Sequence, residues 1–265
     1  MKNILNKISS KTINFYIEQN LDDFYIKSSQ HPNFISHFED KISWVDSRNA
    51  DWPKCIFRAD LTNLNITNEI STIKNLIQET KAPNGWTIGP LTKPDNLGLI
   101  LEKNGFLSAY HQAGMAIDLK DLKKKGMMED DLEVEIIKKE ESLKHWIIVV
   151  STVFGLKIDS ELIQFLFLEP ETRFYLGIFE GEIVSALMLY LSSGVAGLHA
   201  VSTLSEYRNK GFGLTISRVA LIDALRNGYK VGVLQASSLG EPVYRKLGFK
   251  KFCDILSYEL NVENN

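Results

Sequence analysis

The chain has 265 residues, a length that fits one large domain or two domains of roughly 100–150 residues each. Hydrophobic residues make up 44% and charged residues 24%, which excludes a disordered chain and a coiled coil. The net charge of −3 gives no positive field that would attract nucleic acid or an anionic membrane. We find no apolar run of membrane-spanning length and no signal-peptide pattern after Met1, and the two cysteines lie far apart. We therefore expect a cytoplasmic protein without a disulfide framework or metal site.

The first half of the chain carries a weak alternation of helical and extended patterns. A helix is predicted over residues 11–28, a strand over 54–61, a helix over 66–80, a strand over 85–88, a helix over 96–103 and a strand-rich segment over 105–119. A charge-dense stretch with one glycine follows at residues 120–131 and nearly bisects the chain. It is typical of a linker, although the solvated end of a helix fits the same composition.

The second half gives a clearer pattern. After a strand at 132–137, helices are predicted at 141–154 and at 160–168, the second capped by Ser160. Strands at 174–179 and 183–191 flank Gly181 and form a predicted hairpin. A strand at 195–203 precedes a helix over 211–227 that ends at Gly228. A buried strand at 231–235, a helix at 241–247 and a strand-rich segment at 249–260 complete the order.

The two halves can be overlaid. The hexapeptide ending in Phe106 (LEKNGF) is similar to the one ending in Phe249 (YRKLGF), an offset of 249 − 106 = 143 residues. The same offset aligns predicted strands and helices on both sides of this match. The pattern favours two copies of one fold, and the alternative is an unrelated α/β domain in the first half.

The strongest motif is Arg208-x-x-Gly211-x-Gly213, placed between a predicted strand and a predicted helix. Two glycines let the backbone approach a ligand closely, and the N–H groups at a helix start favour an anion such as a pyrophosphate. The alternative is a tight turn with solvated charges. A dinucleotide-binding loop would need GxGxxG after a first parallel strand, and a Walker A loop would end in GK[ST], so neither fits.

On this motif, and on the block from Leu234 to Phe249, residues 132–260 resemble the GNAT superfamily of N-acetyltransferases. The resemblance implies an α/β fold with a mixed sheet and an acetyl-CoA site between the strands that end at Thr203 and Gln235. Main-chain groups of the strand that ends at Thr203 would then bind pantetheine, together with a polar side chain that follows the strand ending at Gln235. The glycine loop would bind the pyrophosphate. The residues implied are Val201, Ser202, Thr203, Arg208, Asn209, Lys210, Gly211, Phe212, Gly213, Leu214 and Ser237.

The resemblance also implies that Tyr244 protonates the departing CoA thiolate, while a substrate amine attacks the acetyl group directly and no metal takes part. A phenol is protonated at neutral pH, which suits an acid, although Tyr244 could also be a core residue. Family members often carry a glutamate on the strand before the glycine motif. Here His199 is the titratable group of that stretch, so it is a candidate base beside the alternatives of a structural histidine or a water chain. Ser237 could equally cap the next helix.

The first half lacks the motif. At the offset of 143, Asn68 and Ile70 replace the two glycines, and Glu69 would repel phosphate. We therefore expect residues 1–122 to be a degenerate GNAT-like domain without a CoA site and residues 131–265 to be the catalytic domain. The predicted function is acetyl transfer from acetyl-CoA to a primary amine of a small molecule or protein, by a monomer or homodimer. The alternatives are a non-catalytic acyl-CoA-binding regulator and a transferase for a larger acyl donor.

Overall fold

The computed structural model describes residues 4–62, 64–122 and 131–261. The helices are α1 (Ile13–Ser28), α2 (Ile66–Gln78), α3 (Leu97–Lys103), α4 (Leu143–Phe154), α5 (Ser160–Phe167), α6 (Phe212–Arg226) and α7 (Glu241–Leu247). The strands are β1 (Ile35–Phe38), β2 (Ser43–Asp46), β3 (Lys54–Phe57), β4 (Gly85–Ile88), β5 (Phe106–Asp118), β6 (Glu133–Ile136), β7 (Thr172–Phe179), β8 (Glu182–Ser192), β9 (Val195–Thr203), β10 (Val231–Ala236) and β11 (Lys250–Leu260). No helix in this part of the chain is long and apolar enough to cross a membrane.

Most predicted elements are confirmed to within two residues at each end, and the structure differs from the predictions in three places. The short hairpin of β1 and β2 was not predicted. Strand β3, predicted to reach residue 61, ends before Arg58, which has φ 53°. The N-cap of α5 is Asp159, whose side chain accepts from the Glu161 N–H, in place of Ser160. Phe154 lies at the end of α4 with 48% of its surface exposed. Most of the predicted linker, residues 123–130, lies outside the described residues.

Within the described residues, eleven strands form one mixed sheet in the order β1-β2-β3-β4-β11-β5-β10-β9-β8-β7-β6. The expected α/β fold with a mixed sheet is confirmed. The pairs β3–β4 and β9–β10 are parallel and the others are antiparallel. Strand β11 is hydrogen-bonded between β4 and β5, and β5 lies between β11 and β10. Each half of the chain therefore gives its last strand to the sheet of the other half.

Helices cover both faces of the central strands. On β5, Met115 and Ile117 point to the core that contains α6 and α7, whereas Ala116 packs with Ile13 and Ile17 of α1 on the opposite face. The alternation follows from the two-residue period of a strand. It places α1 and the pair α6–α7 on opposite sides of the sheet.

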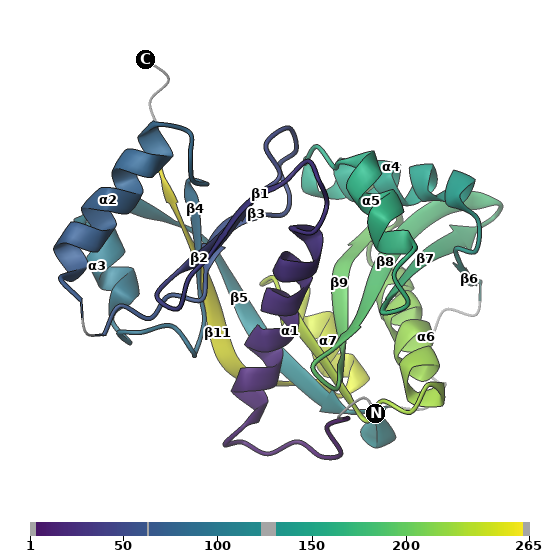
Figure 1. Cartoon of the computed structure of the whole chain (residues 1–265). Coiled ribbons are helices and arrows are strands. Elements are labelled where there is room, and N and C mark those ends of the chain that lie inside the picture. The colour runs from purple at the N-terminus through teal and green to yellow at the C-terminus, as the bar shows by residue number, and fades with distance from the viewer. Residues whose placement is uncertain (1–3, 63, 123–130, 262–265) are drawn as a thin grey trace.

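Helix α1 joins the two halves, and Figure 1 shows it across the middle of the molecule. Leu21, Phe24 and Tyr25 belong to an apolar core that also includes buried residues of β2, β3, β7, β8, α4 and α5. Phe24 stacks on Trp52 with ring centroids 4.8 Å apart. The first half thus covers the face of the sheet that lies next to the predicted site.

Candidate active site

The parallel strands β9 and β10 stop pairing at the place where the sequence predicts the acetyl-CoA site. Their register runs from Ala196–Gly232 to Leu198–Leu234, and no further pairs follow within the described residues. Directly afterwards β9 carries an irregularity against β8, at Ala200, whose φ is 50°. A β-bulge of this kind bends a strand and leaves backbone groups unpaired. Ser202 and Thr203 pair again with β8, whereas the edge of Val201–Thr203 that faces β10 has no strand partner among the described residues.

The glycine loop lies against this strand end. A short 3-10 turn (Ser205–Tyr207) leads to Arg208, whose Nε donates to the Thr203 carbonyl oxygen over 3.3 Å. A Cβ added to Gly213 would lie 3.7 Å from Thr203 Oγ1, so the start of α6 and the end of β9 are in direct proximity. The structure thus brings together the strand residues and the loop residues that the sequence assigned to one ligand.

The N-terminus of α6 is unsatisfied by the protein itself. Its N-cap is Gly211, with φ 84° and no side chain to cap the helix. Among the described residues nothing accepts from the N–H groups of residues 209–213, and the first turn bonds only from Leu214 and Thr215 back to the Gly211 carbonyl. Free N–H groups at a helix start attract an anion. The site can therefore hold a phosphate through the backbone.

The ammonium group of the loop residue Lys210 lies against two aromatic rings. Lys210 Nζ lies over the Phe179 ring at 4.8 Å from its centroid and near the Tyr207 ring at 5.9 Å. Tyr207 in turn donates its hydroxyl to Glu182 over 2.5 Å. These contacts direct Lys210 toward the β7–β8 hairpin. Arg208 is the exposed cation that is bonded to the strand end.

Tyr244 lies on the β10 side of the same region. It is 9% exposed and packs with Leu234, Ala236 and the edge of the Phe249 ring. Burial raises the pKa of Tyr244 well above its usual 10. The nearby Ser217 hydroxyl lowers this pKa by a smaller amount, although it does not have the geometry of a hydrogen bond to Tyr244. The phenol therefore stays protonated over the physiological range, as an acid must.

Ser237 follows β10 in a turn that leads into α7. Its Oγ accepts from the Gly240 N–H over 3.2 Å, so its lone pair supports the turn while its own hydrogen remains free to donate. The helix itself is capped by Gly240. The alternative of Ser237 as the N-cap of this helix is therefore wrong, and the serine stabilises the turn before the helix.

His199 is the buried histidine of β9, on the face that α1 covers. Its Nε2 lies 2.9 Å from Asn20 Oδ1, and burial lowers its pKa to about 4. The sequence pattern predicted no role for Asn20. Nothing local could have indicated it, because the two residues lie 179 positions apart and their contact depends on how α1 crosses the sheet.

The first half has a corresponding pair of strands, β3 and β4, which pair in parallel only at Ile56–Trp86. The helix that follows, α2, caps itself: the Asn65 side chain accepts from the Asn68 N–H, and Glu69 lies in the first turn. A helix start that is already capped and carries a carboxylate does not attract phosphate. Of these two helix starts, only that of α6 is therefore suited to an anion.

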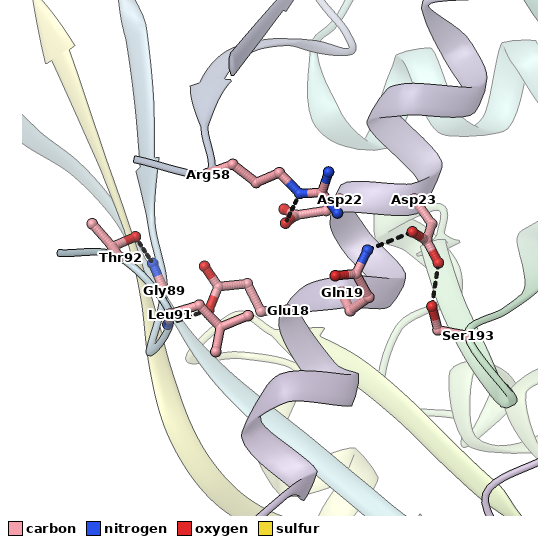
Figure 2. Close-up of polar contacts among 9 residues, drawn as sticks. All are labelled: Glu18, Gln19, Asp22, Asp23, Arg58, Gly89, Leu91, Thr92 and Ser193. Atoms are coloured by element: carbon pink, nitrogen blue, oxygen red, sulfur yellow. Dashed lines mark hydrogen bonds and ion pairs between the residues drawn. The ribbon is translucent and has the colours of Figure 1, made fainter. Parts of the chain in front are cut away.

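Carboxyl groups from α1 fill the end of the first-half strands (Figure 2). Glu18 accepts from the Leu91 N–H over 2.7 Å, and Asp22 accepts from Arg58 Nε over 3.1 Å. A Cβ on Gly89 would come within 2.3 Å of Glu18 Cδ, so the fit is close. Burial raises the pKa of Glu18 to about 7 and, together with the Glu18 charge, that of Asp22 to about 8. The pair therefore titrates near neutrality.

Two pockets lie away from the glycine loop. One of about 620 Å³ is at the opposite end of the first-half strands, and its lining includes Asp46, Lys54, Asn84 and Glu259. The other, of about 240 Å³, lies beside β5 and includes Asp118 and Lys250. The candidate site is thus defined by strand ends and backbone donors and not by either of these pockets. We find no group of three or more potential metal ligands among the described residues.

No protein-family model matches the chain, and no curated protein matches it. Several solved structures, in contrast, have a similar fold. A GCN5-related N-acetyltransferase from Kribbella flavida is 15% identical with a TM-score of 0.68, and the match covers 89% of this chain and 95% of that one. One from Sphaerobacter thermophilus is 13% identical with a TM-score of 0.65, covering 97% and 95%. A glucosamine N-acetyltransferase region of a fungal β-N-acetylglucosaminidase is 11% identical with a TM-score of 0.60, covering 95% and 37%. The chain has the fold of the GCN5-related N-acetyltransferases, over both of its halves.

Proposed function

We propose that the protein is an N-acetyltransferase that moves an acetyl group from acetyl-CoA to a primary amine. The observation that carries the proposal is the uncapped start of α6, with free N–H groups at residues 209–213, against the edge of β9 that β10 no longer pairs. A pyrophosphate at the helix start and pantetheine amides along Val201–Thr203 would satisfy both sets of backbone groups. The general likeness to N-acetyltransferases supports the same assignment.

The reaction needs no covalent enzyme intermediate. The amine nitrogen attacks the acetyl carbonyl carbon, the carbon–sulfur bond breaks, and the sulfur leaves with the electron pair. Tyr244 donates its proton to that sulfur, and its burial near the end of β10 fits this role. The amine loses one proton in the same process, so the products are an amide and free CoA. Each turnover leaves Tyr244 to be reprotonated from solvent.

Thiol release tests the proposal directly. Purified full-length protein is mixed with acetyl-CoA and a panel of amines, and free CoA is measured with a thiol reagent. The panel begins with glucosamine, because one structural neighbour acts on it, and extends to amino acids, aminoglycosides and peptide N-termini. Amine-dependent release of CoA is the expected result. CoA binding without release for any amine would favour the non-catalytic acyl-CoA-binding regulator.

The acyl donor is tested by competition. Acetyl-CoA and longer acyl-CoAs are offered together with the active amine, and the products are separated by mass. We expect the acetyl product to dominate. A dominant longer product would favour the transferase for a larger acyl donor while leaving the site residues unchanged.

A further inference from the structure

The predicted CoA-binding half does not build the surroundings of His199 by itself. Helix α1 of the first half lies against β9 and β10, where Gln235 Nε2 donates to the Ile17 carbonyl over 3.0 Å. About two turns further along α1, Phe24 stacks on the His199 ring with centroids 5.3 Å apart. Between these two contacts Asn20 reaches His199. The imidazole is therefore held by residues that precede the predicted catalytic half by more than a hundred positions.

The hydrogen bonds of Asn20 decide which ring nitrogen of His199 carries the hydrogen. The amide nitrogen of Asn20 donates to the Tyr190 carbonyl over 3.2 Å and to Ser192 Oγ over 2.8 Å. Its Oδ1 is then the atom that faces His199 Nε2 at 2.9 Å, and an amide oxygen can only accept. Nε2 must donate, so in the neutral imidazole the lone pair lies on Nδ1.

Space for this contact depends on Gly197. A Cβ at this position would lie 1.8 Å from Asn20 Oδ1 and 2.7 Å from His199 Nε2. No side chain fits between them, so the glycine is required for the close approach of α1. No described residue donates a hydrogen bond to His199 Nδ1, and 7% of the residue is exposed, so its lone pair has no partner within the described part of the chain.

We propose that His199 Nδ1 accepts the proton that the attacking amine releases, and that Asn20 is the positioning residue that fixes the imidazole in the required tautomer. The inference rests on the proposed function, and it makes the first half of the chain a part of the active site. It also explains why β9 lacks the acidic residue that the family resemblance leads one to expect there.

The chemistry of the step balances. The amine nitrogen forms its bond to the acetyl carbon and becomes strongly acidic, its N–H bond breaks toward Nδ1, and the imidazolium later returns the proton to water. With a pKa lowered by burial to about 4, His199 is neutral at physiological pH and keeps its lone pair free. So weak a base accepts the proton only as the carbon–nitrogen bond forms, since Brønsted behaviour links proton transfer to the acidity of the donor.

Nitrogen NMR and kinetics test the two parts of the proposal separately. Full-length protein with ¹⁵N-labelled histidine gives the tautomer of His199, whose signals are identified by their loss in His199→Gln. We expect the Nε2–H form in the native protein and a mixture of tautomers in Asn20→Ala. For Asn20→Ala we expect kcat to fall at least about tenfold, with the KM for acetyl-CoA and the Kd for CoA unchanged.

Further variants distinguish positioning from a general loss of structure. Asn20→Asp keeps an acceptor for Nε2–H, so the tautomer should persist and kcat should fall less than in Asn20→Ala. Gly197→Ala displaces Asn20 without removing it and should reproduce the Asn20→Ala effect. Gln19→Ala is the matched control: Gln19 is the neighbouring residue on α1 and donates to Asp23, so both tautomer and kcat should stay native.

The outcomes separate this inference from the proposed function. An Nδ1–H form in the native protein, or unchanged kcat in an Asn20→Ala protein whose tautomer is lost, overturns the inference while acetyl transfer stands. Absence of amine-dependent thiol release from the native protein overturns the proposed function, and with it the role of His199 Nδ1, whatever tautomer the spectrum shows.

Discussion

Placing a negative charge at Gly213 probes the predicted phosphate site most directly. The structure leaves room for a side chain there, since an added Cβ would be 3.7 Å from Thr203 Oγ1, an ordinary contact. An Asp carboxylate would lie about 5 Å from a bound phosphate, where each pair of charges repels by about 0.8 kcal/mol in water and about 3 kcal/mol at an effective dielectric constant of 20. Two phosphate charges give a minimum of about 1.6 kcal/mol, so the Kd for CoA should rise at least about tenfold.

The fold should survive this change. A carboxylate in the first turn of a helix is stabilising by about 0.3–1 kcal/mol, so the melting temperature of Gly213→Asp should not fall. Gly213→Asn is the matched control, because it has nearly the same shape without the charge. Calorimetric titration with CoA compares the two variants. Equal affinities within threefold, in two proteins that melt like the native one, would refute a pyrophosphate at the start of α6.

Three further predictions follow from buried groups and from the shared sheet. Tyr244→Phe keeps the ring and loses the acid, so kcat should fall about 10²-fold with the KM for acetyl-CoA unchanged in steady-state assays; an unchanged kcat would assign Tyr244 to the core alone. Burial raises the pKa of Glu18 from 4.5 to about 7, so its proton is held more tightly in the folded state and stability falls as pH rises through this range. Between pH 5 and pH 8, the free energy of unfolding measured in urea should decrease less for Glu18→Gln than for the native protein, by up to about 3 kcal/mol. The control Glu39→Gln, at an exposed position, should behave as the native protein does. Because the halves exchange strands, variants retaining only Trp86 or only Trp146 should report one common urea midpoint by fluorescence, and two separate midpoints would contradict the shared sheet.

The sequence predicted the elements of the second half well because each has a local cause. Gly228, with φ 92°, ends α6, and the left-handed pair Glu180 and Gly181 forms the hairpin turn between β7 and β8. The glycine motif at Arg208–Gly213 was found for the same reason: its chemistry resides in consecutive backbone groups. The first half was harder, since β1 and β2 are four residues each and carry too few positions for a period to be visible.

The arrangement of the sheet and the surroundings of His199 could not be predicted. Alternation marks a strand but not its neighbours, so nothing in β5 indicates that β10 pairs with it from Val231–Asp118 to Ala236–Ala113. The contact of Asn20 with His199 likewise depends on the path of α1 over the sheet. The division into domains at residues 122 and 131 stays a prediction, and the shared core and strands show that the two halves pack as neighbours in one sheet.

The exchange of last strands also sets the order in which the protein can be made. Strand β4 needs β11 as its neighbour, and β11 begins more than 160 residues later, at Lys250. While the ribosome synthesises the second half, β4 and both edges of β5 therefore lack their final partners. Such long-range pairing slows folding, and unpaired edges invite association with other chains. The nascent first half can therefore close its sheet only after β11 has been synthesised and inserted between β4 and β5.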